Sequence, residues 1–356
     1  METAFPRVLV GLSMRWASRI AHMNSISRPT AQLIGFPFGL GANQHAGLDL
    51  GPLALSRAIR ARIDEFELTD QLHFALDPTL QLLDLPHPRP GSDQDEYQTI
   101  QHLEETAEAC AILRDAVVES IRGDRFPIVL GGDHTAALGA LAGLRQAWPN
   151  RRLGVVWIDN HGDVNTGYRG ERFADPNRRG STPSGHIHGM SLAAALGHGD
   201  PALTGVIPSG RFLDPGDVYM IGIRDLDPGE REFLRRHHLP ACTSRQVEAH
   251  GIAEVIRQAV DHLAERGIEL VHLSFDIDAL DASLIPGTGT PVPGGLTFRE
   301  ADLAVKLLRD MLPSHHLDLA GFELVEVNPT MDIGRQTVEI GSRLVCTLLG
   351  EEILPV

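Results

Sequence analysis

The sequence predicts an α/β fold, a three-layer αβα sandwich in which a mostly parallel central sheet lies between two layers of helices. Apolar, strand-like runs alternate along the chain with amphipathic, helix-like stretches, and this alternation is typical of parallel sheets covered on both faces. The chain has 356 residues, of which 42% are hydrophobic, so it can bury one large core. No linker or repeat interrupts the alternation, and we therefore expect residues 31–356 to form a single domain.

The predicted strands are short apolar runs bounded by turn residues. They cover Gln32–Phe38, Leu80–Leu85, Pro127–Leu130, Leu153–Ile158, Asp217–Ile223, Glu269–Asp276 and Leu319–Val327. The predicted helices are longer stretches with apolar residues on one side. They cover Gly51–Arg62, Tyr97–Gly123, Gly251–Arg266, Leu296–Leu312 and Gly334–Leu349, and two more begin near His134 and at Asp227.

Residues 1–30 differ in composition from the rest. Met1–Pro29 has four arginines, one acidic residue and several serines, which is faintly similar to an organelle presequence. Its apolar stretch, Val8–Leu12, is too short for a signal-peptide core or a membrane span. We expect residues 1–30 to be a flexible N-terminal extension, with Met14 and Met23 as alternative start sites.

Three potential metal ligands follow the apolar run that ends at Ile158. Asp159, His161 and Asp163 are spaced two apart, and side chains in an extended segment alternate between faces with this period. All three are therefore expected to point the same way, from the carboxyl end of a buried strand.

Two other apolar runs end in the same kind of residue. One reaches Asp276 and Asp278, again two apart, and the other closes on two glycines, Asp133 and His134. Ligands of open parallel sheets bind beyond the carboxyl ends of the strands, so these residues are expected to surround one crevice.

The four carboxylates of this set repel one another unless cations neutralise them. Two divalent ions would cancel the charge, with some carboxylates bridging both. The expected ligands are oxygen-rich, contain two imidazoles and lack thiolates, which suits Mn²⁺ better than structural zinc, although Ni²⁺ or another divalent ion is possible. They are His134, Asp159, His161, Asp163, Asp276 and Asp278. Two such ions sharing a water molecule would lower its pKa toward neutrality.

Five ordered segments resemble motifs of the ureohydrolase family, and most closely those of its arginases. Three contain the expected ligands, at residues 131–135, 159–166 and 274–281, and the chain continues through 286–295 to Glu-Val-Asn-Pro at 326–329. Segments 184–189 and 221–230 favour arginase within the family. The resemblance implies an arginase-like fold and a dimanganese enzyme. The expected reaction is the hydrolysis of L-arginine to L-ornithine and urea, through attack of a metal-bridging hydroxide on the guanidinium carbon.

The resemblance also assigns roles around the metals. It implies that His188 carries protons to the departing amine and that Glu326 orients the guanidinium, for which a carboxylate can form two parallel hydrogen bonds. Asp163 is expected to accept a hydrogen bond from the hydroxide. Thr290 either places a hydroxyl near the guanidinium or serves a turn.

Substrate choice is expected to depend on residues farther from the metals. The positions that bind the substrate carboxylate in arginases correspond to Asn165, Ser184 and His186, and the one that binds its ammonium corresponds to Asp227. His186 replaces an asparagine, and a histidine can still donate to a carboxylate. Asp227 also fits the N-cap of the following helix. The intervening segment 166–183 is longer than in commonly encountered arginases and is either a solvated surface loop or a lid.

Composition restricts the partners. The formal charge of −16 disfavours nucleic acid and anionic membranes and suits a small cationic guanidino substrate. The cysteines are odd in number and far apart, which favours a reducing, cytoplasmic environment. Family resemblance implies a homotrimer or a homohexamer.

Three alternatives remain. A ureohydrolase for another guanidino substrate, such as agmatine or guanidinobutyrate, would keep the chemistry. A non-enzymatic metal-binding protein would need a broken ligand set, and none of the six ligands is missing. A two-metal phosphoesterase would need a placed basic clamp, which no motif here supplies.

Overall fold

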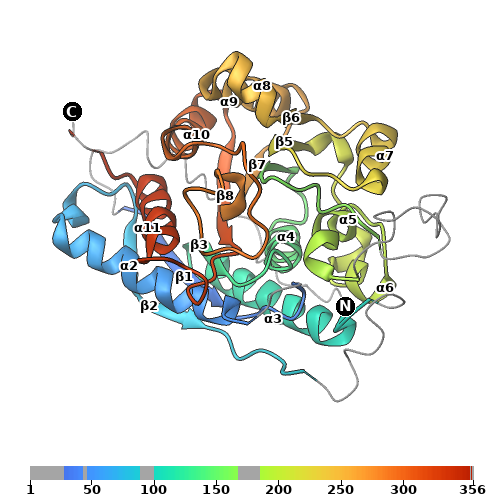
Figure 1. Cartoon of the computed structure of the whole chain (residues 1–356), viewed down its shortest axis with the longest axis horizontal. Coiled ribbons are helices and arrows are strands. Elements are labelled where there is room, and N and C mark those ends of the chain that lie inside the picture. Colours follow the sequence, from blue (N-terminus) through green and yellow to red (C-terminus); the bar gives the residue numbers. More distant parts are fainter. Residues whose placement is uncertain (1–27, 43–45, 89–99, 167–184, 353, 355–356) are drawn as a thin grey trace, which may run out of the picture.

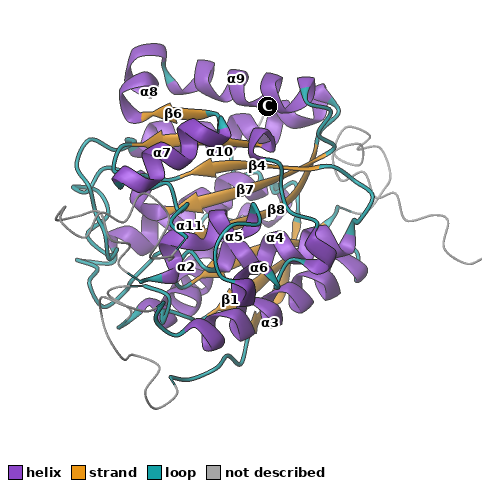
Figure 2. Cartoon of the chain, turned by 90° about the vertical axis from the view of Figure 1, so that its right-hand side faces the viewer, coloured by secondary structure: helices purple, strands orange, loops and turns teal. Residues whose placement is uncertain are grey.

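The computed structural model describes residues 28–42, 46–88, 100–166, 185–352 and 354. Within these residues, eight strands form one sheet in the order β2-β1-β3-β8-β7-β4-β5-β6, and every pair of neighbours is parallel. Figure 2 shows the strands stacked from β6 at the top to β1 near the bottom, between helices. The α/β fold with a parallel sheet flanked by helices is confirmed.

The strands of the sheet are mostly short and buried. They are β1 (Thr30–Phe36), β2 (Ala75–Leu82), β3 (Arg125–Gly131), β4 (Leu153–Ile158), β5 (Val218–Ile223), β6 (Ala241–Thr243), β7 (Leu270–Asp276) and β8 (Asp318–Val325).

The helices differ widely in length, and α3 is the longest of those described. They are α2 (Gly51–Glu65), α3 (Leu103–Arg122), α4 (Ala136–Ala147), α5 (Ser191–Ala195), α6 (Pro201–Thr204), α7 (Pro228–His237), α8 (Ser244–His250), α9 (Ile252–Glu265), α10 (Phe298–Met311) and α11 (Gln336–Leu349). Figure 1 shows their arrangement around the sheet.

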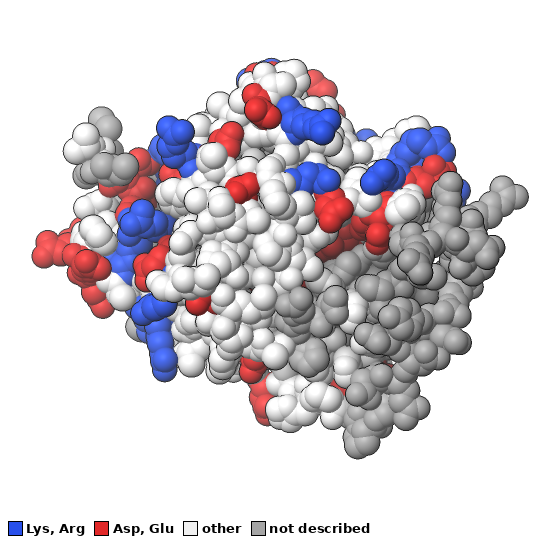
Figure 3. Space-filling model, viewed as in Figure 1, with Lys and Arg blue, Asp and Glu red and all other residues white. Residues whose placement is uncertain are grey.

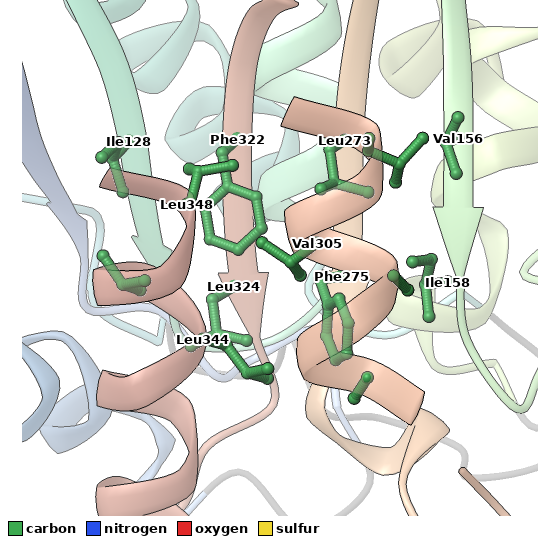
Figure 4. Close-up of a cluster of buried hydrophobic side chains, with 14 of the residues drawn as sticks. Ile128, Val156, Ile158, Leu273, Phe275, Val305, Phe322, Leu324, Leu344 and Leu348 are labelled. Carbon is green, nitrogen blue, oxygen red and sulfur yellow. The ribbon is translucent and has the colours of Figure 1, made fainter. Parts of the chain in front are cut away.

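The sheet buries an apolar layer on each face. Helices α2, α9, α10 and α11 cover one face, whereas α3, α4 and α5 cover the other. In Figure 4, Phe322 of β8 and Phe275 of β7 lie with Val305 of α10 and Leu344 of α11 in the first layer. Side chains two residues apart along a strand share a face of the sheet. The polar residues that follow the central strands at their carboxyl ends therefore lie beyond these apolar layers.

Most predicted elements lie where the sequence places them, but strand β6 and the short helices α5, α6 and α8 were not predicted. Strand β6 has only three residues and leads directly into α8, so neither shows a clear period. Gly251, with φ 79°, separates α8 from α9. Strand β2 also begins at Ala75, five residues before its predicted start at Leu80.

Some expectations fall on parts of the chain that are not described. Residues 1–27 and 167–184 lie outside the described residues, so the flexible extension at 1–30 and the lid at 166–183 stay predictions. Among the helices that are described, none combines the length and the apolar character that crossing a membrane requires.

Candidate metal centre and active site

Four neighbouring strands in the middle of the sheet, β3, β8, β7 and β4, bring their carboxyl ends to the same edge. Each strand is followed there by polar side chains that are buried or nearly so. They are His134 after β3, Glu326 after β8, Asp276 and Asp278 at the end of β7, and Asp159, His161 and Asp163 after β4. Parallel pairing thus collects residues that lie up to 192 positions apart in the sequence.

The imidazole of His134 is fixed on two sides. Its ring stacks on that of Trp157, with centroids 4.3 Å apart and an interplanar angle of 12°. Its Nε2 lies 2.9 Å from the hydroxyl of Ser274. The ring is 1% exposed, so Nδ1 is held facing the interior of the crevice.

Three carboxylates surround Nδ1 of His134. Its distances to carboxylate oxygens of Asp159, Asp163 and Asp276 are 3.2, 3.1 and 3.1 Å. Potential ligand atoms of His134, Asp159 and Asp163 all lie within 4.8 Å of one another, close enough to hold one ion. Asp276 approaches the same nitrogen and can complete this first group.

A second group shares one of these carboxylates. Ligand atoms of Asp159, His161 and Asp278 also lie within 4.8 Å of one another. Nδ1 of His161 is 3.6 Å from Asp159 and 3.3 Å from Asp278. Because Asp159 belongs to both groups, it occupies the position of a bridging ligand between two ions.

Hydrogen bonds from an indole and from backbone N–H groups set the orientation of the carboxylates. The indole of Trp157 donates to Asp159 at 3.0 Å, and the backbone N–H of His161 donates to the other oxygen at 2.7 Å. The N–H of Asp278 donates to Asp276 at 2.8 Å. Asp163 has a left-handed φ of 51°, which few residues other than glycine adopt, and such backbone strain is concentrated at functional sites.

The electrostatics of the crevice fit divalent cations. Burial, together with Asp278 and Asp159, raises the pKa of Asp276 well above its usual value, and burial with Asp159 raises that of Asp163. Within the described residues, Oδ1 of Asp278 is buried without a hydrogen-bond partner, and Nδ1 of His134 lies near three carboxylates without the geometry of a hydrogen bond to any of them. Two divalent ions would neutralise the carboxylates and coordinate these atoms, so the residues fit a pair of metals.

Glu326 and His188 lie next to the metal groups. Oε1 of Glu326 accepts a hydrogen bond from the N–H of His134 at 2.9 Å and lies 3.1 Å from Nδ1 of His188. Burial lowers the pKa of His188, but the contact with Glu326 outweighs it and raises that pKa to about 9. The imidazole is therefore protonated at neutral pH and can give up a proton.

Asp133 links the loop after β1 to His188. Its fully buried carboxylate accepts hydrogen bonds from the N–H groups of Gly41, at 2.8 Å, and Thr135, at 3.1 Å. The carbonyl of Gly41 in turn accepts from the N–H of His188 at 3.0 Å. Burial and nearby Glu326 raise the pKa of Asp133 to about 7.

A pocket of about 220 Å³ opens beside the metal groups and has a polar lining that includes four carboxylates and three histidines. The residues that line it are His161, Asp163, Asn165, His186, His188, Gly189, Asp225, Asp227, Glu230 and Thr290. All the expected substrate-binding residues except Ser184, which lies outside the described residues, therefore gather at one opening.

Several lining residues form hydrogen bonds or ring contacts with neighbouring side chains. The amide of Asn165 donates to Asp227 at 3.2 Å, and the hydroxyl of Thr290 donates to Asp278 at 3.0 Å. The ring of His186 stands edge-on to that of His188, with centroids 6.4 Å apart. Thr290 thus contacts a candidate ligand and also lines the pocket.

Three residues of this site do not appear among the candidates from the sequence. Trp157 and Ser274 each precede a candidate ligand by two positions, so the same period-two argument that selects Asp159 and Asp276 places them on the same side. Glu230 forms a capping box with Asp227, and the Asp-Pro-Gly-Glu sequence carries that signature.

The chain was compared with known proteins. A family model described as "Arginase family" matches residues 29–350. Arginase from Bacillus caldovelox is 38% identical over 323 residues, which cover 90% of this chain and 98% of that protein. Its native structure superposes with a TM-score of 0.78 and 36% identity, over 92% of this chain and all of the other. Arginase from Entamoeba histolytica, solved with L-ornithine, gives a TM-score of 0.75 at 28% identity, with coverage of 92% and 100%.

These matches extend over nearly the whole chain and include the strand ends where the two candidate metal groups lie. The resemblance inferred from the motifs is therefore confirmed, and the chain belongs to the arginase family of metal-dependent ureohydrolases.

Proposed function

We propose that this protein is a dimanganese arginase that hydrolyses L-arginine to L-ornithine and urea. The observation that carries the proposal is the pair of ligand groups sharing Asp159, next to a pocket that also contains His188. Solved relatives support it, because they include an arginase crystallised with L-ornithine.

The ligand chemistry supports manganese as the metal. The set combines four carboxylates with two imidazoles and no thiolate, and carboxylate-rich sites suit Mn²⁺ and similar ions. We propose that His134, Asp159 and Asp163, with Asp276 beside them, would hold one ion and that Asp159, His161 and Asp278 would hold the other. When bound, such a pair lowers the pKa of a shared water molecule and so supplies a nucleophile near neutral pH.

The remaining residues would orient the substrate and move protons. Glu326 orients the planar guanidinium, so that its carbon faces the nucleophile, and Asp163 accepts a hydrogen bond from the nucleophile. Oxygen adds to the guanidinium carbon, the bond from that carbon to the side-chain nitrogen breaks, and the nitrogen leaves as an amine. His188 would deliver the proton which that nitrogen needs, and its contact with Glu326 at 3.1 Å favours the protonated imidazole.

The outer part of the pocket would select the amino acid. Asp227 accepts hydrogen bonds from the substrate ammonium, and Asn165, Ser184 and His186 donate to its carboxylate. The Asn165–Asp227 hydrogen bond supports this assignment because it holds a donor and an acceptor side by side at the opening.

A substrate panel tests the proposal. Purified, manganese-loaded protein should release urea from L-arginine with a higher kcat/KM than from agmatine or 4-guanidinobutyrate, both of which lack part of the amino-acid group. The absence of arginine turnover would contradict the proposal.

His186 favours a comparison with a second guanidino substrate, because it replaces an asparagine at a position that binds the substrate carboxylate in arginases. If the natural substrate is another guanidino compound, wild type should prefer that compound, and His186→Asn should not create arginine activity. If the substrate is arginine, His186→Asn should change mainly KM for arginine, with kcat nearly unchanged.

We also propose a homotrimer or a homohexamer that resides in the cytoplasm. The three cysteines, Cys110, Cys242 and Cys346, are all buried and free, which suits a reducing compartment.

On the face drawn in Figure 3, basic and acidic residues are interspersed, and a central area is largely uncharged. Light scattering on the purified protein tests the subunit count, and a monomeric mass would contradict it.

A further inference from the structure

A buried histidine and a buried glutamate form a pair behind the metal centre. His272 of β7 and Glu323 of β8 are 1% and 0% exposed, and their Nε2 and Oε2 atoms are 3.5 Å apart. Within the described part of the chain, neither nitrogen of His272 and neither oxygen of Glu323 has a hydrogen-bond partner. Leaving four buried polar atoms unsatisfied is costly, so they require a partner beyond these side chains.

The pair lies beside the serine that contacts a candidate metal ligand. Ser274 is two residues after His272 on β7, so both side chains point to the same face of the sheet. Ser274 is also the register partner of Glu323 on β8. On its other side, Ser274 contacts Nε2 of His134 at 2.9 Å.

Coordination of a metal through Nδ1 would fix the direction of these hydrogen bonds. A histidine that binds through Nδ1 carries its proton on Nε2, so His134 would donate to Ser274. The hydroxyl proton of Ser274 then needs an acceptor of its own. Glu323 presents two unpartnered carboxylate oxygens on the same face and on the adjacent strand.

One water molecule can complete this connection. Buried waters typically bind two to four polar groups, and Ser274, Glu323 and His272 would supply three. The register partner of His272 on β8 is Gly321, where an added Cβ would lie 3.2 Å from Nδ1 and crowd the ring.

We propose that Glu323 and His272 are positioning residues for the metal ligand His134, and that they act through a buried water and Ser274. The carboxylate at the end of the chain favours the tautomer of His134 with Nδ1 free, and it makes that nitrogen a better ligand. The proposal rests on the metal centre of the proposed function but not on the identity of the substrate.

Metal titration of the metal-free protein tests the proposal without reference to activity. Glu323→Gln keeps the size of the side chain and removes its charge, and it should weaken apparent Mn²⁺ affinity about tenfold, in the range seen for partners of metal ligands. Asp217→Asn is the matched control. Asp217, directly before β5, is another buried carboxylate, but it pairs with Arg152 and Arg266 and not with a candidate ligand. Its variant should bind Mn²⁺ as wild type does.

A double-mutant cycle tests whether the effect passes through Ser274. If it does, Ser274→Ala combined with Glu323→Gln should bind Mn²⁺ no more weakly than Ser274→Ala alone. Additive losses would overturn the proposal, as would wild-type affinity in Glu323→Gln. If Glu323→Gln does not fold, His272→Gln replaces it in the same cycle, under the same criterion. Wild type that binds manganese but does not turn over arginine would defeat the proposed substrate and leave this inference standing.

Discussion

Glu230 joins the two segments that form the outer part of the pocket. Its carboxylate accepts hydrogen bonds from the N–H groups of Val164, at 3.3 Å, and Asp227, at 2.9 Å. Burial raises its pKa from 4.5 to about 8, with Asp163 and Asp227 contributing. The loop that contains Asp163 is thus tied to the start of α7 by a side chain that can be uncharged in the folded, metal-free protein.

This raised pKa predicts a pH dependence of stability. Below the unfolded value of 4.5 the group is protonated in both states; as pH rises toward about 8, the unfolded chain loses the proton while the folded protein keeps it. The contribution of Glu230 to stability should therefore decrease across this interval. Denaturant unfolding of metal-free wild type and Glu230→Gln should show a stability difference that changes with pH in this direction, whereas parallel curves would contradict it.

His188 yields a prediction about catalysis. His188→Asn removes the proposed proton carrier and should lower kcat by about 10² to 10⁴-fold, since this is the usual contribution of a positioned acid or base. Bound manganese should change little, because the ion pair of His188 is with Glu326 and not with a candidate metal ligand. A variant with normal kcat would show that the proton comes from elsewhere.

The candidate ligands could be predicted from the sequence because metals accept few residue types and because period two fixes their direction. Trp157 and Ser274 follow the same period, but tryptophan and serine are common core residues, so only the structure reveals their contacts with Asp159 and His134. His272 and Glu323 could not be paired at all, since the register of β7 against β8 depends on the whole sheet.

At the scale of elements, the turn after β3 depends on a glycine. A Cβ at Gly132 would lie 1.7 Å from the carbonyl oxygen of Phe38, and this backbone atom cannot move aside. The carbonyl of Gly132 also accepts a hydrogen bond from the backbone N–H of Glu326 at 2.7 Å. Gly132 therefore lets the turn after β3 approach Phe38 closely, and the same turn holds the residue that follows β8.

Gly132→Ala should accordingly destabilise the protein severely, by more than about 3 kcal/mol, or prevent folding. Gly189→Ala is a control in the same site, because an added Cβ there would meet its nearest atom at 3.8 Å and should change stability by less than about 0.5 kcal/mol. Thermal unfolding of both variants checks this, and equal midpoints would contradict it.

The predictability of the elements follows their length and burial. Strand β4 was predicted to the residue because Leu153–Ile158 is fully buried and bounded by turns. Strand β6 has three residues of mixed burial and no period to recognise, and α8 follows it directly. The ends of the amphipathic helix α10 lie within two residues of their predicted positions, whereas α3 begins at Leu103 although its helix was predicted from Tyr97.

At the scale of the molecule, parallel pairing of the sheet brings the active residues together. Strands β3, β8, β7 and β4 are adjacent in space, although β8 is last in the chain. The sequence predicted that their ends would share one edge, but it could not give the strand order, which long-range packing determines. Because the metals would bind only the folded arrangement, their binding free energy should add to the stability of the whole protein.

Removal of metal should therefore lower the unfolding temperature. Wild type treated with a chelator should melt at a lower temperature, and the midpoint should return as Mn²⁺ is added and rise further with its concentration. Asp276→Asn, which removes one carboxylate oxygen from the centre, should show a smaller shift. Identical melting of wild type with and without manganese would argue against a metal centre.

The most direct test of the central claim is to measure manganese content and urea release in one preparation. Metal-free protein should be inactive with arginine, and activity should rise with added Mn²⁺ and reach its plateau at two bound ions per chain. A folded protein that binds no divalent metal, or that releases urea equally well without one, would contradict the account.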